Sequence, residues 1–151
     1  MDSQFTIVIA DDHPLFRGAL YQAVHMAIDE ARLLEADSID SLTHLLAEHP
    51  EVDLLLLDLK MPGANGFEGL AYLRGQYPDL PIVVVSASED AAIIQQVLRL
   101  GALGFIPKSV PMKELVSALN TVIGGDNWVP EGISLHPESE DGPDFASKLA
   151  S

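Results

Sequence analysis

Short apolar runs, each about the length of a β-strand, alternate along this chain with longer amphipathic segments. Continuous runs of aliphatic residues between turn residues are typical of a parallel sheet that is covered on both faces. The runs fall at residues 5–10, 52–57, 82–85 and 102–106, with a weaker candidate at 33–36. The alternation therefore predicts five strand–helix units in a doubly wound α/β fold, joined by right-handed crossovers.

The segments between the runs carry the start and stop signals of helices. Pro14 and Pro111 stand where two helices would begin, and Ser38 is placed to cap a helix over residues 39–48. Aliphatic residues recur at helical spacing in each segment, which predicts one buried face per helix. The remaining helices are expected over residues 66–77 and 89–100, and the last one ends at the Gly124-Gly125 pair.

Composition narrows the class of protein. The chain has 151 residues, enough for about one domain, and a formal net charge of -15. We expect no direct DNA binding by residues 1–151, because phosphate contacts need lysine and arginine. The absence of cysteine excludes disulfides and thiolate metal sites. No apolar run approaches the roughly 20 residues of a membrane span, and the N-terminus lacks a signal-peptide pattern, so a cytoplasmic protein without membrane contact is expected.

The chain changes character after Gly125. Residues 126–151 are rich in acidic residues and proline and poor in large apolar side chains, which is typical of a linker or tail. We therefore expect a domain over residues 1–125 and an acidic linker over residues 126–151. Trp128 is the one tryptophan of the chain and is expected to dock back on the domain, because a lone tryptophan usually finds a buried face.

Polar residues follow four of the apolar runs at the point where each run ends. Asp11 and Asp12 follow the first run, and the next such positions are Asp58, Ser86 and Lys108. In an open parallel sheet the carboxyl ends of the strands share one edge, where ligands bind. Taken singly, each of these residues is more often a turn residue, a helix cap or a surface charge. As a set in this order, they predict one convergent polar site.

Three carboxylates in one small site repel each other unless a cation is present. Oxygen ligands suit Mg²⁺, and Asp11, Asp12 and Asp58 are expected to hold it. The backbone carbonyl of Lys60 would complete the set. Asp58 ends the central run and precedes a Met-Pro-Gly turn, so it is the expected acceptor in a phosphoryl transfer that forms an acyl phosphate.

The transferred phosphoryl group also needs stabilising partners. Lys108 supplies a compact positive charge, and the hydroxyl of Ser86 can donate a hydrogen bond to a phosphate oxygen. His13 lies beside Asp12 but precedes Pro14, and we interpret it as a loop residue, with contact to a ligand as the lesser alternative. The histidines of the chain show no metal-binding spacing.

With these residues in place, the chain resembles the receiver domain of bacterial two-component response regulators, in particular the NarL/LuxR type. The resemblance covers residues 5 to 125 and is specific because several weak motifs occur together. The motifs are Ile9-Ala10-Asp11-Asp12-His13-Pro14, Asp58-Leu59-Lys60-Met61-Pro62-Gly63, Val85-Ser86-Ala87 and Gly104-Phe105-Ile106-Pro107-Lys108.

The resemblance implies a flavodoxin-like fold with strand order 2-1-3-4-5 and a signalling protein rather than an enzyme. Asp58 would receive its phosphoryl group from a sensor histidine kinase, with Asp11 and Asp12 handling Mg²⁺. Ser86 and Phe105 match the switch pair of the family; plain core is the alternative for Phe105, and its position three residues before Lys108 favours the switch. On phosphorylation the hydroxyl would move toward the phosphate and the ring would turn inward, which shifts the surface around the fourth helix, fifth strand and fifth helix. A homodimer is a further expectation.

Two departures from the family pattern bear on these expectations. Many members carry Lys-Pro, whereas Pro107 precedes Lys108 here. NarL/LuxR-type regulators also carry a C-terminal helix-turn-helix domain, for which residues 126–151 leave no room, so transcription would be controlled through a DNA-binding domain missing from this chain. The alternatives are a stand-alone receiver that binds other proteins and a Mg²⁺-dependent phosphatase of the haloacid dehalogenase type. That phosphatase family has a second Asp where this chain has Lys60.

Overall fold

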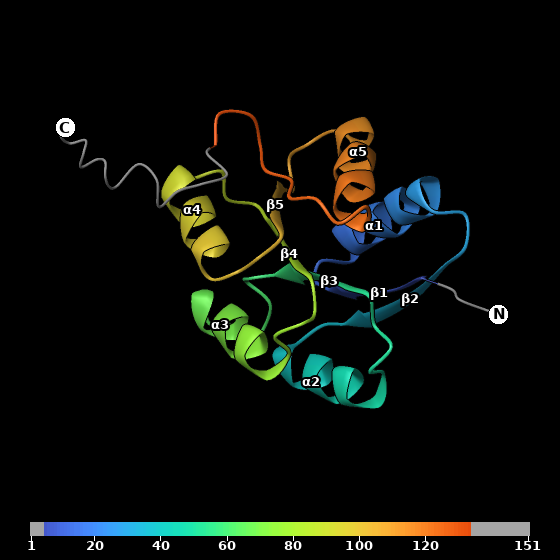
Figure 1. The fold of residues 1–151 in the computed structure, drawn as a ribbon, viewed down its shortest axis with the longest axis vertical. Helices are drawn as coiled ribbons and strands as arrows, with labels where there is room; N and C mark the ends of the chain where they lie inside the picture. Colours follow the sequence, from blue (N-terminus) through green and yellow to red (C-terminus); the bar gives the residue numbers. More distant parts are fainter. Residues whose placement is uncertain (1–4, 134–151) are drawn as a thin grey trace.

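The computed structural model describes residues 5–133 and shows strands and helices in strict alternation (Figure 1). The strands are β1 (Phe5–Ala10), β2 (Ala31–Ala36), β3 (Leu54–Asp58), β4 (Ile82–Ser86) and β5 (Gly104–Pro107). The helices are α1 (Pro14–Ala27), α2 (Ile39–Glu48), α3 (Phe67–Gln76), α4 (Ala91–Arg99) and α5 (Met112–Ile123). All neighbouring strands are parallel, in the order β2-β1-β3-β4-β5. The predicted flavodoxin-like topology is therefore confirmed.

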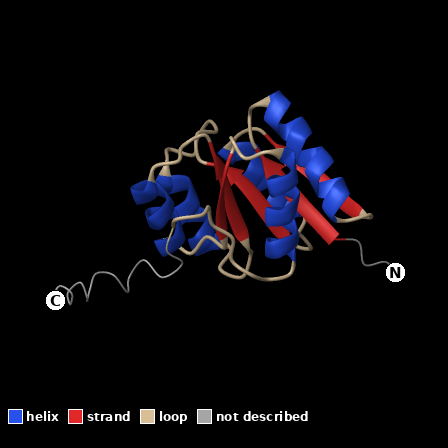
Figure 2. Cartoon of the chain, turned by 90° about the horizontal axis from the view of Figure 1, so that it is seen from above, coloured by secondary structure: helices blue, strands red, loops and turns tan. Residues whose placement is uncertain are grey.

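Helices cover both faces of the sheet (Figure 2). On one face lie α2, α3 and α4, whose residues Leu42, Leu70 and Val97 belong to one hydrophobic cluster. On the other face lie α1 and α5, whose residues Leu20 and Leu119 belong to a second cluster. Side chains along a strand alternate between the two faces, so the strands contribute to both clusters.

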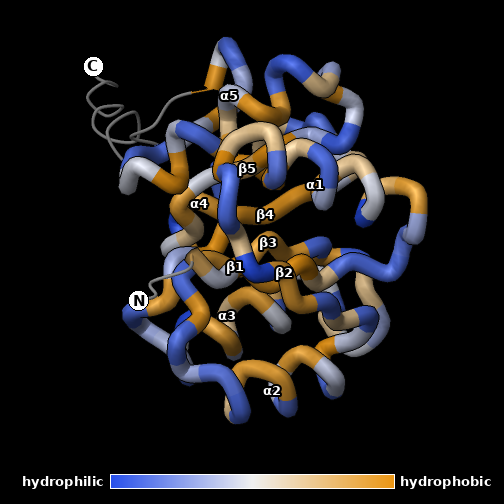
Figure 3. The backbone as a smooth tube through the Cα atoms, turned by 90° about the vertical axis from the view of Figure 1, so that its right-hand side faces the viewer, coloured by the Kyte–Doolittle hydropathy of each residue, from blue (hydrophilic) through white to orange (hydrophobic). Residues whose placement is uncertain are grey.

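The central strand β3 shows why the polar site lies at a strand end. Every residue of β3 is buried, with Leu55 in the cluster beneath α2–α4 and Leu56 in the cluster beneath α1 and α5. Burial of each leucine contributes about 2 kcal/mol to folding. Figure 3 shows the strands as a hydrophobic centre between helices with many hydrophilic positions. A strand buried on both faces offers a polar residue access to solvent only where the strand ends, and Asp58 occupies that position.

The edge strand β2 was the weakest candidate in the sequence, and its composition explains why. It begins at Ala31, two residues before the predicted start, and includes the exposed charges Arg32 and Glu35. Charged residues on an edge strand discourage pairing with another sheet, but they also interrupt the apolar pattern. The strand is therefore recognisable mainly from its pairing with β1.

The helices begin near the carboxyl ends of the strands, as the βα order requires. The predicted cap of α2 is confirmed: the Ser41 N–H donates to Ser38 Oγ at 3.0 Å, and the Ser38 N–H donates to Ser41 Oγ at 3.2 Å. At α4, the Ala92 N–H donates to the Asp90 carboxylate at 2.8 Å. The carboxyl edge of the sheet consequently faces helix N-termini, whose dipoles favour anions.

The chain beyond α5 returns to the sheet. The Phe105 N–H donates to the carbonyl oxygen of Trp128 at 3.1 Å, and the side-chain amide of Asn127 donates to the Leu103 carbonyl at 2.7 Å. Trp128 also forms a parallel bridge with Gly104 and packs against the cluster beneath α1 and α5. The predicted docking of Trp128 is confirmed, and ordered contacts continue past residue 125. Residues 134–151, which hold most of the predicted acidic linker, lie outside the described residues.

No helix within residues 5–133 combines the length and the apolar character that crossing a membrane would take.

Candidate functional site

The carboxyl edge of the sheet brings the predicted site residues together. They lie at the ends of four strands: Asp11 after β1, Asp58 in β3, Ser86 in β4 and Lys108 after β5. Neighbouring strands end in register, since Ser86 pairs with Pro107, the residue before Lys108. The convergence expected from the sequence therefore occurs, and it depends on β1 and β3 being adjacent in the centre of the sheet.

Asp58 is almost fully buried, with 1% of its surface exposed. The backbone N–H of Lys60 donates to one carboxylate oxygen, Oδ1, at 3.0 Å. The ammonium of Lys108 donates to the other oxygen, Oδ2, at 3.2 Å. The loop after β3 and the end of β5 thus hold the orientation of the Asp58 carboxylate between them.

Asp11 and Asp12 differ in environment although they are adjacent. Asp11 is fully buried at 0% exposure, and its Oδ1 accepts a hydrogen bond from the His13 backbone N–H at 2.7 Å. Asp11 Oδ2 is buried and accepts no hydrogen bond from any of residues 5–133. The Lys108 ammonium nitrogen lies 2.9 Å from it, close enough to offset its charge. Asp12 is more exposed and faces solvent beside this pair.

Lys108 provides the positive charge of the site. Its backbone N–H donates to the Ser86 carbonyl at 2.7 Å, which anchors the residue to the end of β4. Its side chain, 14% exposed, extends past the Phe16 ring, with the ammonium 4.9 Å from the ring centroid. A cation over an aromatic face is attracted by the ring quadrupole. The contact with Phe16 thereby helps to hold the Lys108 side chain in the direction of Asp11 and Asp58.

His13 lies within the site, whereas the sequence favoured a loop residue and held ligand contact only as the lesser alternative. Its Nδ1 atom lies 3.3 Å from Asp11, 3.5 Å from Asp12 and 3.6 Å from Asp58, measured to carboxylate oxygens. The same atom lies 3.1 Å from the Lys108 ammonium. The signal in the sequence was its place directly after the two acids, but sequence alone does not say which way a loop side chain points.

Ser86 and Phe105 are both inside the protein. The Ser86 Oγ accepts a hydrogen bond from the Ser88 N–H at 3.1 Å, so in this structure the hydroxyl is turned toward the β4–α4 loop. Phe105 is 0% exposed and belongs to the same hydrophobic cluster as Ile94 and Val97 of α4. The ring is thus buried in this structure, and its inward turn on phosphorylation stays a prediction.

The acidic residues and His13 have the spacing that a single cation needs. Asp11, Asp12, His13 and Asp58 each offer one ligand atom, and these atoms lie within 4.8 Å of one another. The buried Asp11 Oδ2, which pairs with the Lys108 ammonium in this structure, is an oxygen ligand of the kind that a divalent cation takes. The donor set therefore fits a cation. The contact of Lys60 with Asp58 is through its N–H, and the role of its carbonyl stays a prediction.

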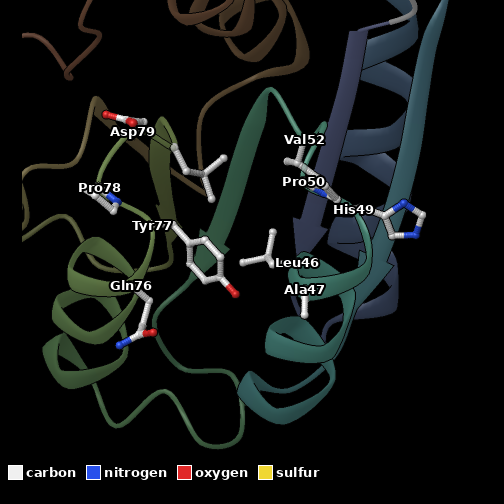
Figure 4. Close-up of a pocket in the computed structure, with 10 residues that line it drawn as sticks. Leu46, Ala47, His49, Pro50, Val52, Gln76, Tyr77, Pro78 and Asp79 are labelled. Carbon is white, nitrogen blue, oxygen red and sulfur yellow. The ribbon is translucent and has the colours of Figure 1, made fainter.

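Two hollows in the surface give access to the site. One, of about 240 Å³, is lined by Asp58 and Lys108 together with His13 and Phe16. The other, of about 690 Å³, lies between the loops after β3 and β4 and reaches Ser86. Asp58 can consequently be approached from outside although little of it is exposed. A third hollow, of about 470 Å³, lies at the opposite edge of the sheet, between the ends of α2 and α3 (Figure 4).

Comparisons of this chain with a protein family, with curated proteins and with solved structures all find response regulators. The family described as "Response regulator receiver domain" matches residues 7–120. The glycerol metabolism activator of Pseudomonas putida is 39% identical over 129 residues, covering 85% of this chain and 58% of that protein. The nitrate/nitrite response regulator protein NarL of Escherichia coli is 36% identical, covering 85% of this chain and 59% of that protein. The crystal structure of a LuxR family DNA-binding response regulator from Silicibacter pomeroyi has a TM-score of 0.73 at 28% identity, covering 84% of this chain and 98% of that one.

Proposed function

The chain belongs to the response regulator receiver family, of the NarL/LuxR type, and we propose that Asp58 is the residue on which it accepts a phosphoryl group from a sensor histidine kinase. Receivers of this family act in phosphorelay signalling. The observation that carries the assignment is the position of Asp58: a buried carboxylate that ends the central strand, faces the Lys108 ammonium at 3.2 Å and opens to a surface hollow.

The transfer would proceed by attack of a carboxylate oxygen of Asp58 on the phosphorus atom. A new O–P bond forms an acyl phosphate, while the N–P bond to the kinase histidine breaks and its electron pair returns to the imidazole nitrogen. The Lys60 N–H and the Lys108 ammonium hold the carboxylate in one orientation before the reaction. The Lys108 charge then lies beside the transferred phosphoryl oxygens and lowers the cost of their negative charge.

Asp11, Asp12 and Asp58 would hold a divalent cation, with the Lys60 carbonyl as a further ligand. When bound, the cation offsets negative charge on the transferring phosphoryl group. The chain's own contribution is the fixed cluster of acceptors, in which Asp11 Oδ2 is paired with the Lys108 ammonium at 2.9 Å. Among the residues the structure describes, the close spacing of these acceptors is the most direct support for a cation at this place.

Ser86 and Phe105 are the proposed switch pair. To reach an Asp58 phosphate, the Ser86 hydroxyl would have to give up the hydrogen bond that it accepts from the Ser88 N–H. Phe105 packs in the cluster that contains α4, so a change in its position would displace α4 and the surface it shares with β5 and α5. We also propose that the protein forms a homodimer.

The output is proposed to be control of transcription through a domain beyond residue 151. The chain spans less than three-fifths of the NarL relative, which leaves length for a further domain in a protein of that size. Residues 1–125 would receive the signal and residues 126–151 would connect the two parts. DNA binding would belong to the further domain, because the net charge of this chain is -15.

Catalytic turnover is not part of the proposal. The haloacid dehalogenase type of phosphatase needs a second acid two residues after the nucleophile, and that position is Lys60. A receiver should take up phosphate once per molecule and release it slowly, whereas a phosphatase should hydrolyse a small phosphate ester continuously.

The test is mass spectrometry of the intact chain after incubation with acetyl phosphate and Mg²⁺. We expect one added phosphoryl group on the wild type and none on Asp58→Asn. The exposed Asp79, at the opposite edge of the sheet, provides the matched control, since Asp79→Asn should take up phosphate normally. An addition that persists in Asp58→Asn would overturn the assignment.

A further inference from the structure

His13 brings a nitrogen atom into a group of carboxylates. Its Nδ1 lies within 3.6 Å of an oxygen of each of Asp11, Asp12 and Asp58. The magnesium site expected from the sequence consists of oxygen ligands only, which is the set Mg²⁺ prefers. The His13 ring nitrogen is therefore not one of the ligands expected for Mg²⁺, although it lies beside all three carboxylates.

The loop holds the His13 ring in this place through its backbone. The His13 N–H donates to Asp11 Oδ1 at 2.7 Å, which closes a tight turn over the buried acid. Pro14 follows and starts α1, and a residue before proline is restricted to extended conformations. His13 has φ -99° and ψ 105°, in agreement with that restriction. Its side chain reaches back over the carboxylates from this fixed point, although 62% of the side chain is exposed.

The Lys108 ammonium lies at a point that is close to three acceptor atoms. Its nitrogen lies 2.9 Å from Asp11 Oδ2, 3.2 Å from Asp58 Oδ2 and 3.1 Å from His13 Nδ1. An ammonium has donors only, so a hydrogen bond between Lys108 and His13 requires the tautomer in which Nδ1 is unprotonated and directs its lone pair to the same point. A metal ion attracts ligands of the same kind, namely carboxylate oxygens and an imidazole lone pair.

Asp11 Oδ2 faces the same point. It is buried, and among residues 5–133 its charge partner is the Lys108 ammonium, 2.9 Å away, although the contact lacks hydrogen-bond geometry. A metal cation at this point would take over that pairing. A cation that reached both Asp11 Oδ2 and Asp58 Oδ2 would have His13 Nδ1 at hand as a third ligand.

We propose that His13 is a metal ligand that gives this site a preference for a first-row transition ion, with Mn²⁺ as the probe, over Mg²⁺. The inference rests on the cation site of the proposed function and adds its selectivity. Carboxylates suit both Mg²⁺ and Mn²⁺, whereas an imidazole adds more affinity for a first-row transition ion than for Mg²⁺, with Mn²⁺ at the weak end of that series. Lys108 would leave the shared point when the ion enters and would become free to pair with a phosphoryl group.

The first experiment identifies the ligand directly. Pulsed electron paramagnetic resonance of Mn²⁺ bound to the full 151-residue chain should show coupling to a ¹⁴N nucleus. The coupling should vanish in His13→Phe, which keeps a ring of similar size without a lone pair. His44 is an exposed histidine on α2, and His44→Phe should keep the coupling. Bound Mn²⁺ without nitrogen coupling in the wild type would overturn the inference.

The second experiment measures selectivity by calorimetric titration with each ion alone. His13→Phe should weaken Mn²⁺ binding about tenfold, the usual scale for losing one contributor to a metal site, and should change Mg²⁺ binding by less than about twofold. Equal weakening of both ions would also overturn the inference. Its failure is distinct from failure of the proposed function, because phosphate uptake on Asp58 is scored separately by mass with Mg²⁺ present.

Discussion

The two edges of the sheet are made by the same strands but have opposite characters. The carboxyl edge carries Asp11, Asp58 and Lys108 in one small polar site. The amino edge is closed by apolar packing: Figure 4 shows Leu46 at the end of α2 and Tyr77 after α3 facing the same hollow. The amino end of β5 is covered in addition by the chain after α5, through the hydrogen bond from the Phe105 N–H to Trp128.

The difference follows from the direction of the helices. Each helix begins at the carboxyl edge, where its first N–H groups and the positive end of its dipole favour anions. Each helix ends at the amino edge, where the chain turns back into a strand and apolar residues close the gap. Apolar packing at the amino edge therefore stabilises the fold, whereas the carboxyl edge keeps buried charges that phosphoryl transfer would use.

The largest effect on stability is expected from truncating a buried apolar side chain at the amino edge. Leu46 is buried in the cluster beneath α2–α4, and Leu46→Ala should lower the free energy of unfolding by about 3 kcal/mol, because it removes apolar contacts and leaves a cavity. Leu15 is 92% exposed, so Leu15→Ala should change stability by less than about 0.5 kcal/mol. Urea unfolding measures both. Phosphate uptake by Leu46→Ala should be unchanged below its melting temperature. A loss of phosphate uptake would show that the site at the carboxyl edge depends on packing at the amino edge.

The next effect concerns the segment around Trp128, which pairs with β5. A Cβ atom on Gly104 would lie 2.6 Å from the Trp128 carbonyl oxygen, so Gly104→Ala must displace the segment and break its hydrogen bond to Phe105. The expected loss is about 2 kcal/mol. The fluorescence of Trp128, the one tryptophan of the chain, should shift toward that of a solvated indole.

Gly75 provides the matched control for this change. It lies in α3, and a Cβ atom added there would meet nothing within 4 Å. Gly75→Ala should be neutral or stabilise the helix by up to about 1 kcal/mol, and the Trp128 emission should not move. An unshifted emission in Gly104→Ala would mean that the segment is not held by this contact.

A smaller effect of opposite sign is expected at the carboxyl edge. Asp58→Asn removes one of three neighbouring carboxylates, which share a single ammonium, while it keeps the size of the side chain. We expect the free energy of unfolding at pH 7 without added metal to rise by about 1 kcal/mol. Thermal unfolding of wild type, Asp58→Asn and the exposed Asp79→Asn would measure it. A clear loss of stability would show that the Lys108 pair outweighs the repulsion.

The smallest effect concerns Glu51, an exposed residue at the amino edge. The hydrogen bond with the His49 side chain lowers the pKa of Glu51 below its ordinary value of 4.5, and the charge of Arg32 adds to the effect. A lowered pKa in the folded state stabilises the protein above pH 4.5, and this contribution is lost as the pH falls through the lowered pKa. The stability difference between wild type and Glu51→Gln should therefore shrink below pH 4.5. A difference that grows toward acid pH would contradict the sign.

Much of the fold was predictable because its signals are local. The runs that became β1, β3 and β4 are apolar on both faces, and two helices start at local signals, Pro14 as the first residue of α1 and Ser38 as the cap of α2. The edge strand β2 was harder, because an edge strand need not be apolar throughout. The convergence of Asp11, Asp58 and Lys108 was also predictable, since each follows a strand and parallel strands end at one edge.

By itself, the sequence determined which residues would meet, because hydrophobic periodicity places the strands and strand order brings their ends together. Only the tertiary structure decided how the side chains meet. The turn of His13 over the acids, the hydrogen bond that holds Ser86 toward its own loop and the return of Trp128 to β5 all depend on contacts between distant segments. The direction of a loop side chain is set by the partners that surround it, and those partners exist only once the sheet has formed.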